Sequence, residues 1–115
     1  MAASRGARTA LSFWARAGTW LELERAQYRL AHTWIKAGDP AQARRHAQSC
    51  LDTVRQHDAP ALEQFFAWEA LACVERAAGD PLAQARAVQQ ARAVFERLTP
   101  EDRASCQASL DPLIV

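Results

Sequence analysis

The four residues Ala-Gly-Asp-Pro occur at positions 37–40 and again at 78–81, so the chain repeats itself with a period of 41 residues. The flanking residues agree at the same offset, because Leu30-Ala31 falls on Leu71-Ala72. Self-similarity with a period of about 20 to 50 residues is the sequence signature of stacked repeat folds. We therefore expect two copies of one structural unit, one after the other.

The repeated motif predicts a tight corner between two helices. Gly38 can adopt the left-handed conformation that ends a helix, because it has no Cβ atom. Asp39 is placed to cap the next helix by accepting a hydrogen bond from its free amides, and Pro40 suits the first helical position. The same reasoning applies to residues 79–81. A connection this short makes the two joined helices antiparallel neighbours.

Apolar residues on both sides of the corners are spaced by three or four positions, as one face of a helix requires. This spacing predicts two hairpins, with helices at about residues 20–37, 40–57, 60–78 and 81–98. The expected buried faces are Leu23, Ala26, Leu30, Trp34 and Ala37, then Ala43, Ala47, Cys50, Leu51 and Val54, then Phe65, Ala67, Leu71, Val74 and Ala78, and finally Val88, Ala91, Phe95 and Leu98.

A second match competes for the register of the repeats, because residues 41–44 agree with residues 83–86 at an offset of 42. That offset places the apolar Cys50 opposite Arg92, whereas an offset of 41 places it opposite Ala91. Burying a charge without a partner costs several kcal/mol. The offset of 41 is therefore the physical register.

The segment before the hairpins is basic, since residues 1–18 contain arginines and no acidic residue. This composition fits a helix whose apolar side chains pack on the first repeat, or alternatively an organelle transit peptide. We expect a break at Gly18, with Thr19 as a helix cap. Between the hairpins, Asp58 is the expected cap of the next helix and Pro60 a residue of its first turn.

The segment after the hairpins carries its own start signal. Thr99 is the expected cap of a last helix, and Pro100 suits its first position. This helix is short and mostly polar, and we expect it to end near Leu110. The apolar residues 113–115 form a tail that should fold back or meet a partner.

The composition narrows the class of protein. The chain has 115 residues, with 14 basic and 13 acidic side chains and a net charge of +1, so it has no general attraction to nucleic acid or anionic membranes. No apolar run approaches the roughly 20 residues that cross a bilayer. Cys50, Cys73 and Cys106 are an odd number of widely separated cysteines, which favours a reducing compartment over a disulfide framework. We expect one all-α domain located in the cytoplasm.

These residues resemble tetratricopeptide repeats, in an elongated form of about 40 residues instead of 34. Gly38 and Gly79 correspond to the glycine between the two helices of that pattern. The resemblance covers roughly residues 24–98 and implies a right-handed stack of helical hairpins, with about six helices when the flanking segments are included. The expected division is an N-terminal segment at residues 1–18, repeats at 19–57 and 58–98, and a C-terminal capping helix at 99–115.

The resemblance also implies where a ligand binds, since the first helices of such stacks line a concave groove. Spacing alone places Arg25, Tyr28, His32 and Lys36 on one helix face. A face that mixes aromatic and basic side chains suits a peptide with apolar anchors and some negative charge. A solvated face, or one covered by a second copy of the chain, is the alternative. The implied groove residues are Arg25, Tyr28, His32, Ile35 and Lys36 in the first repeat, and Phe66, Glu69, Cys73 and Arg76 in the second.

Several residues suggest chemistry, but none forms a recognised catalytic or metal-binding motif. His46, Cys50 and His57 share one stripe of a helix and two of them could hold a metal, yet Cys50 belongs to the expected core. Cys73 and His32 could meet across the two first helices, but the sequence shows no third group to orient them. Phosphate-binding loops and hydrolase motifs are absent from the sequence. We expect no catalytic residue, no metal and no cofactor.

The leading hypothesis is a non-catalytic protein-interaction module that binds a peptide or protein segment, without nucleic-acid or membrane contacts. The alternatives are a structural homo-oligomerisation unit and a small helical-bundle enzyme or ligand sensor with a closed pocket. About three repeats are normally needed to bury the faces of such units. Because only two are present, either the flanking helices or a second copy must cover the ends, and we expect a homodimer.

Overall fold

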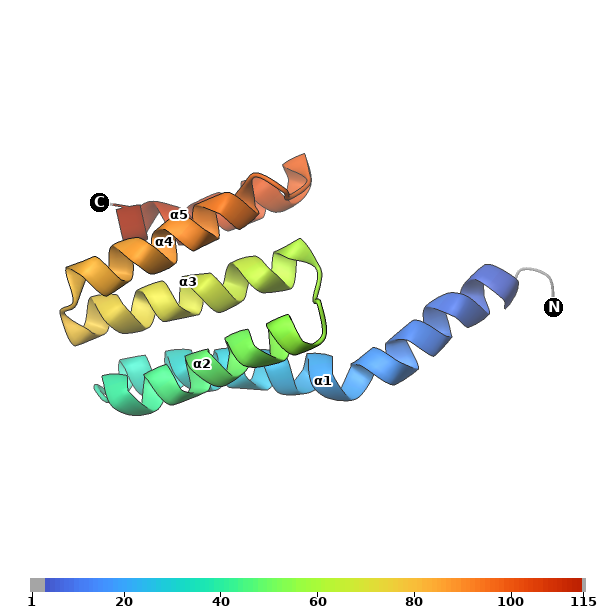
Figure 1. Cartoon of the computed structure of the whole chain (residues 1–115), viewed down its shortest axis with the longest axis horizontal. Coiled ribbons are helices and arrows are strands. Elements are labelled where there is room, and N and C mark those ends of the chain that lie inside the picture. Colours follow the sequence, from blue (N-terminus) through green and yellow to red (C-terminus); the bar gives the residue numbers. More distant parts are fainter. Residues whose placement is uncertain (1–3, 115) are drawn as a thin grey trace.

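The protein is built from five helices that follow one another without a strand in residues 4–114, the part that the computed structural model describes. Side chains are described for residues 19–114. The helices are α1 (Ser4–Lys36), α2 (Pro40–Gln56), α3 (Ala61–Ala78), α4 (Pro81–Phe95) and α5 (Pro100–Ile114), as labelled in Figure 1. The predicted all-α class is confirmed.

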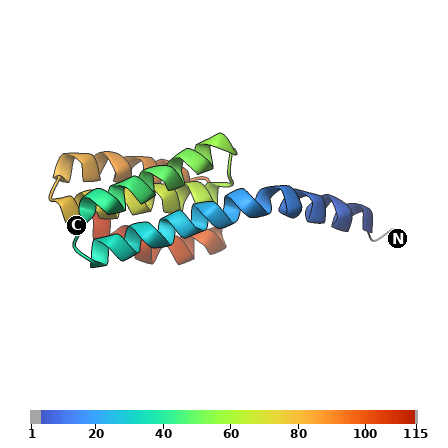
Figure 2. The same cartoon turned by 90° about the horizontal axis from the view of Figure 1, so that it is seen from below.

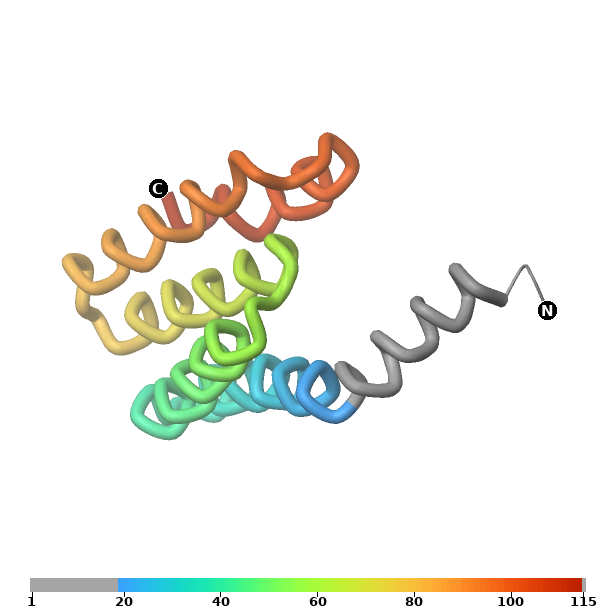
Figure 3. The backbone as a smooth tube through the Cα atoms, turned by 45° about the vertical axis from the view of Figure 1, so that its right-hand side comes forward, coloured from blue at the N-terminus to red at the C-terminus, as the bar shows by residue number. Residues whose placement is uncertain are grey.

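The helices form two stacked hairpins and a terminal helix (Figure 1). Helix α1 pairs with α2 and α3 pairs with α4, and the two hairpins meet where α3 packs against both α1 and α2. Helix α5 lies against α3 and α4. The view in Figure 2 shows α2 and α4 on one side of the stack, and the tube in Figure 3 follows the chain through the successive corners. The odd-numbered helices therefore form one layer, because α3 contacts both α1 and α5.

Both predicted corners are present. Gly38 and Gly79 have φ angles of 80° and 74°, in the left-handed region. The Asp39 carboxylate accepts a hydrogen bond from the Gln42 amide at 3.1 Å, and the Asp80 carboxylate accepts one at 3.0 Å from the third residue after it. A proline occupies the start of each following helix. The repeated motif thus produces the same local geometry twice.

The core confirms most of the predicted apolar faces and the register between the repeats. All five predicted residues of α2 are buried, as are four of the five predicted in α3, where Ala78 is exposed. Of the four residues predicted for the last buried face, Val88, Ala91 and Leu98 are buried, whereas Phe95 is only partly buried. Cys50 and Ala91 are both fully buried while Arg92 is exposed, as the offset of 41 requires.

The predicted face of α1 is confirmed only for Trp34, which packs against the core, and the buried stripe is otherwise shifted by about one residue. Leu23 and Leu30 are 49% and 39% exposed, and Ala37 is exposed as well. Besides Trp34, the residues that turn inward are Leu21, Glu24, Tyr28, Ala31 and Ile35, which keep the helical spacing but are shifted along the helix. The apolar pattern missed this stripe because one of its buried members, Glu24, is acidic.

Several predicted boundaries also need correction. Helix α1 runs without a break through Gly18 and Thr19, because a single glycine inside a helix costs only about 1 kcal/mol. Residues 4–114 therefore contain five helices instead of the expected six or so. Asp58 does not cap α3: it takes a left-handed φ of 46°, and the residue before α3 is Pro60, which makes no side-chain cap. The predicted packing of side chains in residues 1–18 lies outside the described side chains.

The last helix starts as predicted and ends later. The Thr99 hydroxyl accepts a hydrogen bond from the Asp102 amide at 3.1 Å, which confirms the cap. Helix α5 continues past Leu110 and through Pro112 to Ile114. Leu113 is buried, so this part of the tail folds back, while Ile114 is 43% exposed and residue 115 lies outside the described part.

Candidate functional site

The surface formed by α1, α3 and α5, here called the groove face, carries two adjoining hollows. The Phe66 hollow has a volume of about 280 Å³. The Cys73 hollow has a volume of about 250 Å³. Tyr28 lines both of them. The Phe66 hollow is lined by Glu24, Arg25, Tyr28, Leu62, Glu63 and Phe66, and the Cys73 hollow by Tyr28, His32, Glu69, Cys73, Arg76, Ser109, Pro112 and Leu113.

Aromatic rings connect the groove face to the core. The rings of Tyr28 and Phe66 meet edge to face with centroids 5.6 Å apart. Phe66 makes a similar contact, at 5.4 Å, with the fully buried Phe65. Edge-to-face packing is a favoured geometry for aromatic pairs. Tyr28 is thereby held in a fixed position between the two hollows.

A buried carboxylate organises the polar side of the Cys73 hollow. Glu69 is 3% exposed and accepts a hydrogen bond from the Tyr28 hydroxyl at 2.6 Å. Its other oxygen lies 3.0 Å from His32 Nε2 and accepts from the Cys73 thiol at 3.3 Å. Three polar groups thus surround one buried acid, as the cost of burying an isolated charge requires. We call Tyr28, His32, Glu69 and Cys73 the Glu69 cluster.

The Glu69 cluster shifts the acidity of its own members. Burial and then the Glu69 charge raise the pKa of the Cys73 thiol to about 12. The same two causes raise the pKa of the Tyr28 hydroxyl above its ordinary value. Both groups therefore remain protonated donors near neutral pH. Because the thiolate is the nucleophilic form, a thiol in this state does not suit nucleophilic catalysis.

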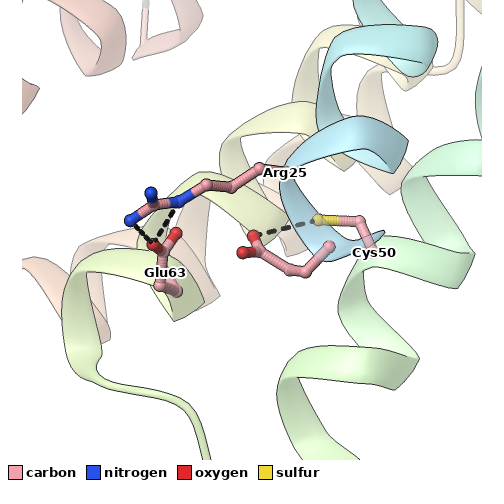
Figure 4. Close-up of polar contacts among 4 residues, drawn as sticks. Arg25, Cys50 and Glu63 are labelled. Atoms are coloured by element: carbon pink, nitrogen blue, oxygen red, sulfur yellow. Dashed lines mark hydrogen bonds and ion pairs between the residues drawn. The ribbon is translucent and has the colours of Figure 1, made fainter. Parts of the chain in front are cut away.

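A second set of charges lies beside the Phe66 hollow. Arg25 of α1 donates from Nη2 and Nε to one oxygen of Glu63 of α3, at 2.6 and 2.9 Å, which joins the two repeats (Figure 4). Nearby, Glu24 is only 1% exposed. Its Oε1 accepts from the Cys50 thiol of α2 at 3.5 Å, whereas its Oε2 has no hydrogen-bond partner among the described residues. Burial, and then the charge of Glu63, raise the pKa of Glu24 to about 7.

The structure brings together most of the predicted groove residues. Tyr28, His32 and Cys73 all contact Glu69, and Phe66 packs against Tyr28. Arg76 lines the Cys73 hollow, and Arg25 lines the Phe66 hollow and pairs with Glu63. Lys36 is exposed at the end of α1 and lines neither hollow. Ile35 packs on the core instead of facing outward.

Sequence reasoning missed Glu24, Glu63 and the contribution of α5. The usable signal for Glu24 is its position, since it lies three residues after Leu21 and seven before Ala31, on the buried stripe of α1. Glu63 lies in the first turn of α3, where acidic residues are common because they interact favourably with the helix dipole. Its position therefore gave no sign of a pairing with α1. Nothing in the sequence places Ser109 of α5 at the Cys73 hollow.

The other residues considered for chemistry serve separate contacts. His46 Nδ1 lies 2.7 Å from the Gln27 side-chain oxygen, and the His57 ring stacks on Trp20 at 4.8 Å. Cys50 is in the core and points to Glu24. Cys73 and His32, in contrast, are brought to within 4.8 Å of each other, and Glu69 is the third group that contacts both of them.

Two larger hollows lie elsewhere on the surface, between α4 and α5 and over α2, α3 and α4. Their charged lining residues are exposed, and the buried acids Glu24, Glu63 and Glu69 all lie at the groove face instead. The groove face is therefore the better candidate for a functional site.

A comparison with the models of known protein families finds no match, and comparisons with curated proteins and with solved structures find none either. Among the described helices, none combines the length and the hydropathy needed to cross a membrane.

Proposed function

We propose that this chain is a tetratricopeptide-like module that binds an extended segment of a partner protein along the groove face. The proposal is supported by the repeated corners, the register of 41 residues and the layer of α1, α3 and α5. In a stack of this kind the groove face is the concave surface, formed by the first helices of successive units. The module acts without catalysis.

The observation that carries the proposal is the position of Tyr28 between two hollows of different chemistry. The Phe66 hollow offers aromatic and aliphatic surface from Tyr28, Leu62 and Phe66. The Cys73 hollow is lined in part by Arg76, an exposed cation for which the described residues provide no ion pair. An occupant that matches both hollows carries an apolar anchor and, a few residues away, a carboxylate.

Selection of peptides on the full chain tests this proposal. A displayed peptide library is expected to yield sequences that pair an apolar residue with an acidic one. In calorimetric titration of such a peptide, Phe66→Ala should weaken binding by at least about tenfold, since anchor residues in pockets carry most of the binding energy. Arg76→Glu should weaken it by a similar factor, because it replaces attraction of the peptide carboxylate with repulsion.

The matched control is Leu82→Ala, which alters an apolar side chain on α4 that is 62% exposed and lines none of the four hollows. It should leave peptide affinity unchanged. Failure to select any peptide, or equal binding by the wild-type chain and the Phe66→Ala and Arg76→Glu variants, would show that the groove face does not bind peptides.

A second candidate function, self-association through α1, is favoured by one specific observation. Leu23 and Leu30 are exposed, lie seven residues apart and so share one stripe of the helix. Apolar residues at this spacing form the seam between paired helices. A second copy of the chain, pairing through its own α1, would cover both leucines.

We expect the wild-type chain to elute as a dimer in size-exclusion chromatography with light scattering. Leu30→Glu should convert it to a monomer, because it places a charge in the apolar seam. Leu82→Glu is the matched control on α4 and should remain a dimer. A wild-type monomer at high concentration would contradict self-association through α1.

A further inference from the structure

Three side chains of the groove face present different metal-binding atoms to one point between α1 and α3. They are His32 Nε2, a Glu69 carboxylate oxygen and Cys73 Sγ, which all lie within 4.8 Å of one another. Glu69 and Cys73 are four residues apart on α3 and therefore share a helix face, while His32 approaches from α1. The stacking of the two repeats, and not local sequence, creates this set.

Two of the three distances within the set are close to those of a tetrahedral metal site, and the third, between His32 Nε2 and Cys73 Sγ, is at most 4.8 Å. Zinc binds thiolate at about 2.3 Å and imidazole or carboxylate at about 2.0–2.2 Å, so the ligand atoms lie roughly 3.3–3.6 Å apart. In the structure, Glu69 Oε1 is 3.0 Å from His32 Nε2 and 3.3 Å from Cys73 Sγ. An ion placed among these atoms would replace the two contacts that Glu69 Oε1 makes with His32 and Cys73.

The chemistry of the three donors selects the ion. Sulfur and imidazole nitrogen suit zinc and related transition metals, whereas magnesium and calcium prefer oxygen ligands. Three protein ligands leave one position for water or another group. The Cys73 hollow, about 250 Å³ in volume, adjoins the site and provides the space for it.

The surroundings supply the outer contact that metal sites usually have. The Tyr28 hydroxyl donates to Glu69 Oε2 at 2.6 Å, which leaves Oε1 directed to His32 and Cys73. Such outer hydrogen bonds orient ligating carboxylates and tune affinity. The charges also fit, because Glu69 and an ionised Cys73 together neutralise a divalent cation.

We propose that His32, Glu69 and Cys73 bind a Zn²⁺ ion that links α1 to α3, with the fourth position open to the Cys73 hollow. Binding releases the Cys73 thiol proton to solvent, so metal affinity should rise with pH. This proposal departs from our expectation of a metal-free chain. It does not depend on peptide binding.

Titration of the reduced 115-residue chain with Co²⁺ as a spectroscopic substitute for Zn²⁺ tests the proposal. One equivalent of Co²⁺ should produce the absorption bands of tetrahedral cobalt together with a thiolate-to-cobalt charge-transfer band, and Zn²⁺ should displace it. Cys73→Ser should abolish the charge-transfer band. His32→Gln and Glu69→Gln should weaken Co²⁺ binding by at least about tenfold. Loss of a residue that only hydrogen-bonds to a metal ligand already lowers metal affinity by about this factor, so loss of a ligand should cost no less.

The matched controls are His46→Gln and Cys106→Ser, which change the same residue types outside the set and should leave the titration unchanged. Circular dichroism verifies that each variant is folded. If Cys73→Ser does not fold, Tyr28→Phe serves instead, and it should reduce affinity about tenfold while keeping the band. Absence of stoichiometric Co²⁺ binding, or equal affinity in the His32→Gln and Glu69→Gln variants, would overturn the proposal.

Discussion

Replacing Phe65 with alanine is expected to lower the free energy of unfolding by about 4 kcal/mol, within the range of about 3–5 kcal/mol for buried phenylalanines. Phe65 is fully buried in α3, and its ring contacts those of Phe66 and Phe95 at centroid distances of 5.4 and 6.1 Å. Alanine removes these contacts and leaves a cavity that helices on both sides cannot close. The loss is large for a domain of this size, whose total stability is typically about 5–15 kcal/mol.

Urea unfolding followed by circular dichroism measures the effect. Phe95→Ala is the matched control, because Phe95 is only partly buried and its truncation should cost clearly less. A loss below about 1.5 kcal/mol for Phe65→Ala, or one no larger than that for Phe95→Ala, would mean that Phe65 is not at the centre of the core. Since Phe65 supports Phe66, we also expect weaker peptide binding in this variant.

Replacing Glu24 with glutamine is expected to stabilise the protein at pH 8 and to have little effect at pH 5. The pKa of Glu24 is raised from 4.5 to about 7 in the folded state, so folding favours the protonated acid. Stability from this group is fully present below pH 4.5 and is lost as the pH rises through 7. One pKa unit corresponds to about 1.4 kcal/mol, so the charged form costs the folded state about 3 kcal/mol above pH 7.

Glutamine resembles the protonated acid and cannot ionise, which removes this cost. The measurement is urea unfolding of the wild-type and variant chains at pH 5 and pH 8, because the difference between the two chains isolates Glu24 from the rest of the protein. Glu22→Gln, two residues earlier on the exposed side of α1, is the control and should show no such pH dependence. Equal effects of Glu24→Gln at the two pH values would contradict the burial of a raised-pKa acid.

The candidate site could be predicted from the sequence only in pieces. The spacing of Tyr28 and His32 places them on one face of α1, and Glu69 and Cys73 are related in the same way on α3. The resemblance to a repeat family predicted that the two pairs lie on one face, and Tyr28, His32 and Cys73 do contact Glu69. It did not give the hydrogen bonds, because these depend on how far α1 is rotated against α3.

That rotation is also where the sequence-based prediction failed. Apolar spacing selected the stripe through Leu23 and Leu30, yet the helix buries the stripe through Leu21, Glu24 and Ala31. A hydropathy pattern assigns every acidic residue to the exposed face, so it cannot identify a buried stripe that contains Glu24. Its burial is tolerated here because Cys50 donates to it and its pKa rises toward neutrality, neither of which a single helix reveals.

The sequence by itself determined the two corners, the helices they join and the offset that matches one hairpin with the next. These features are local: a glycine, an aspartate and a proline set backbone angles and caps within a few residues. The tertiary structure alone decided the rotation of α1 against α3 and the placement of His32 and Cys73 around Glu69. Such features depend on packing between segments about 40 residues apart, where side-chain shape and the cost of burying charge outweigh local preference.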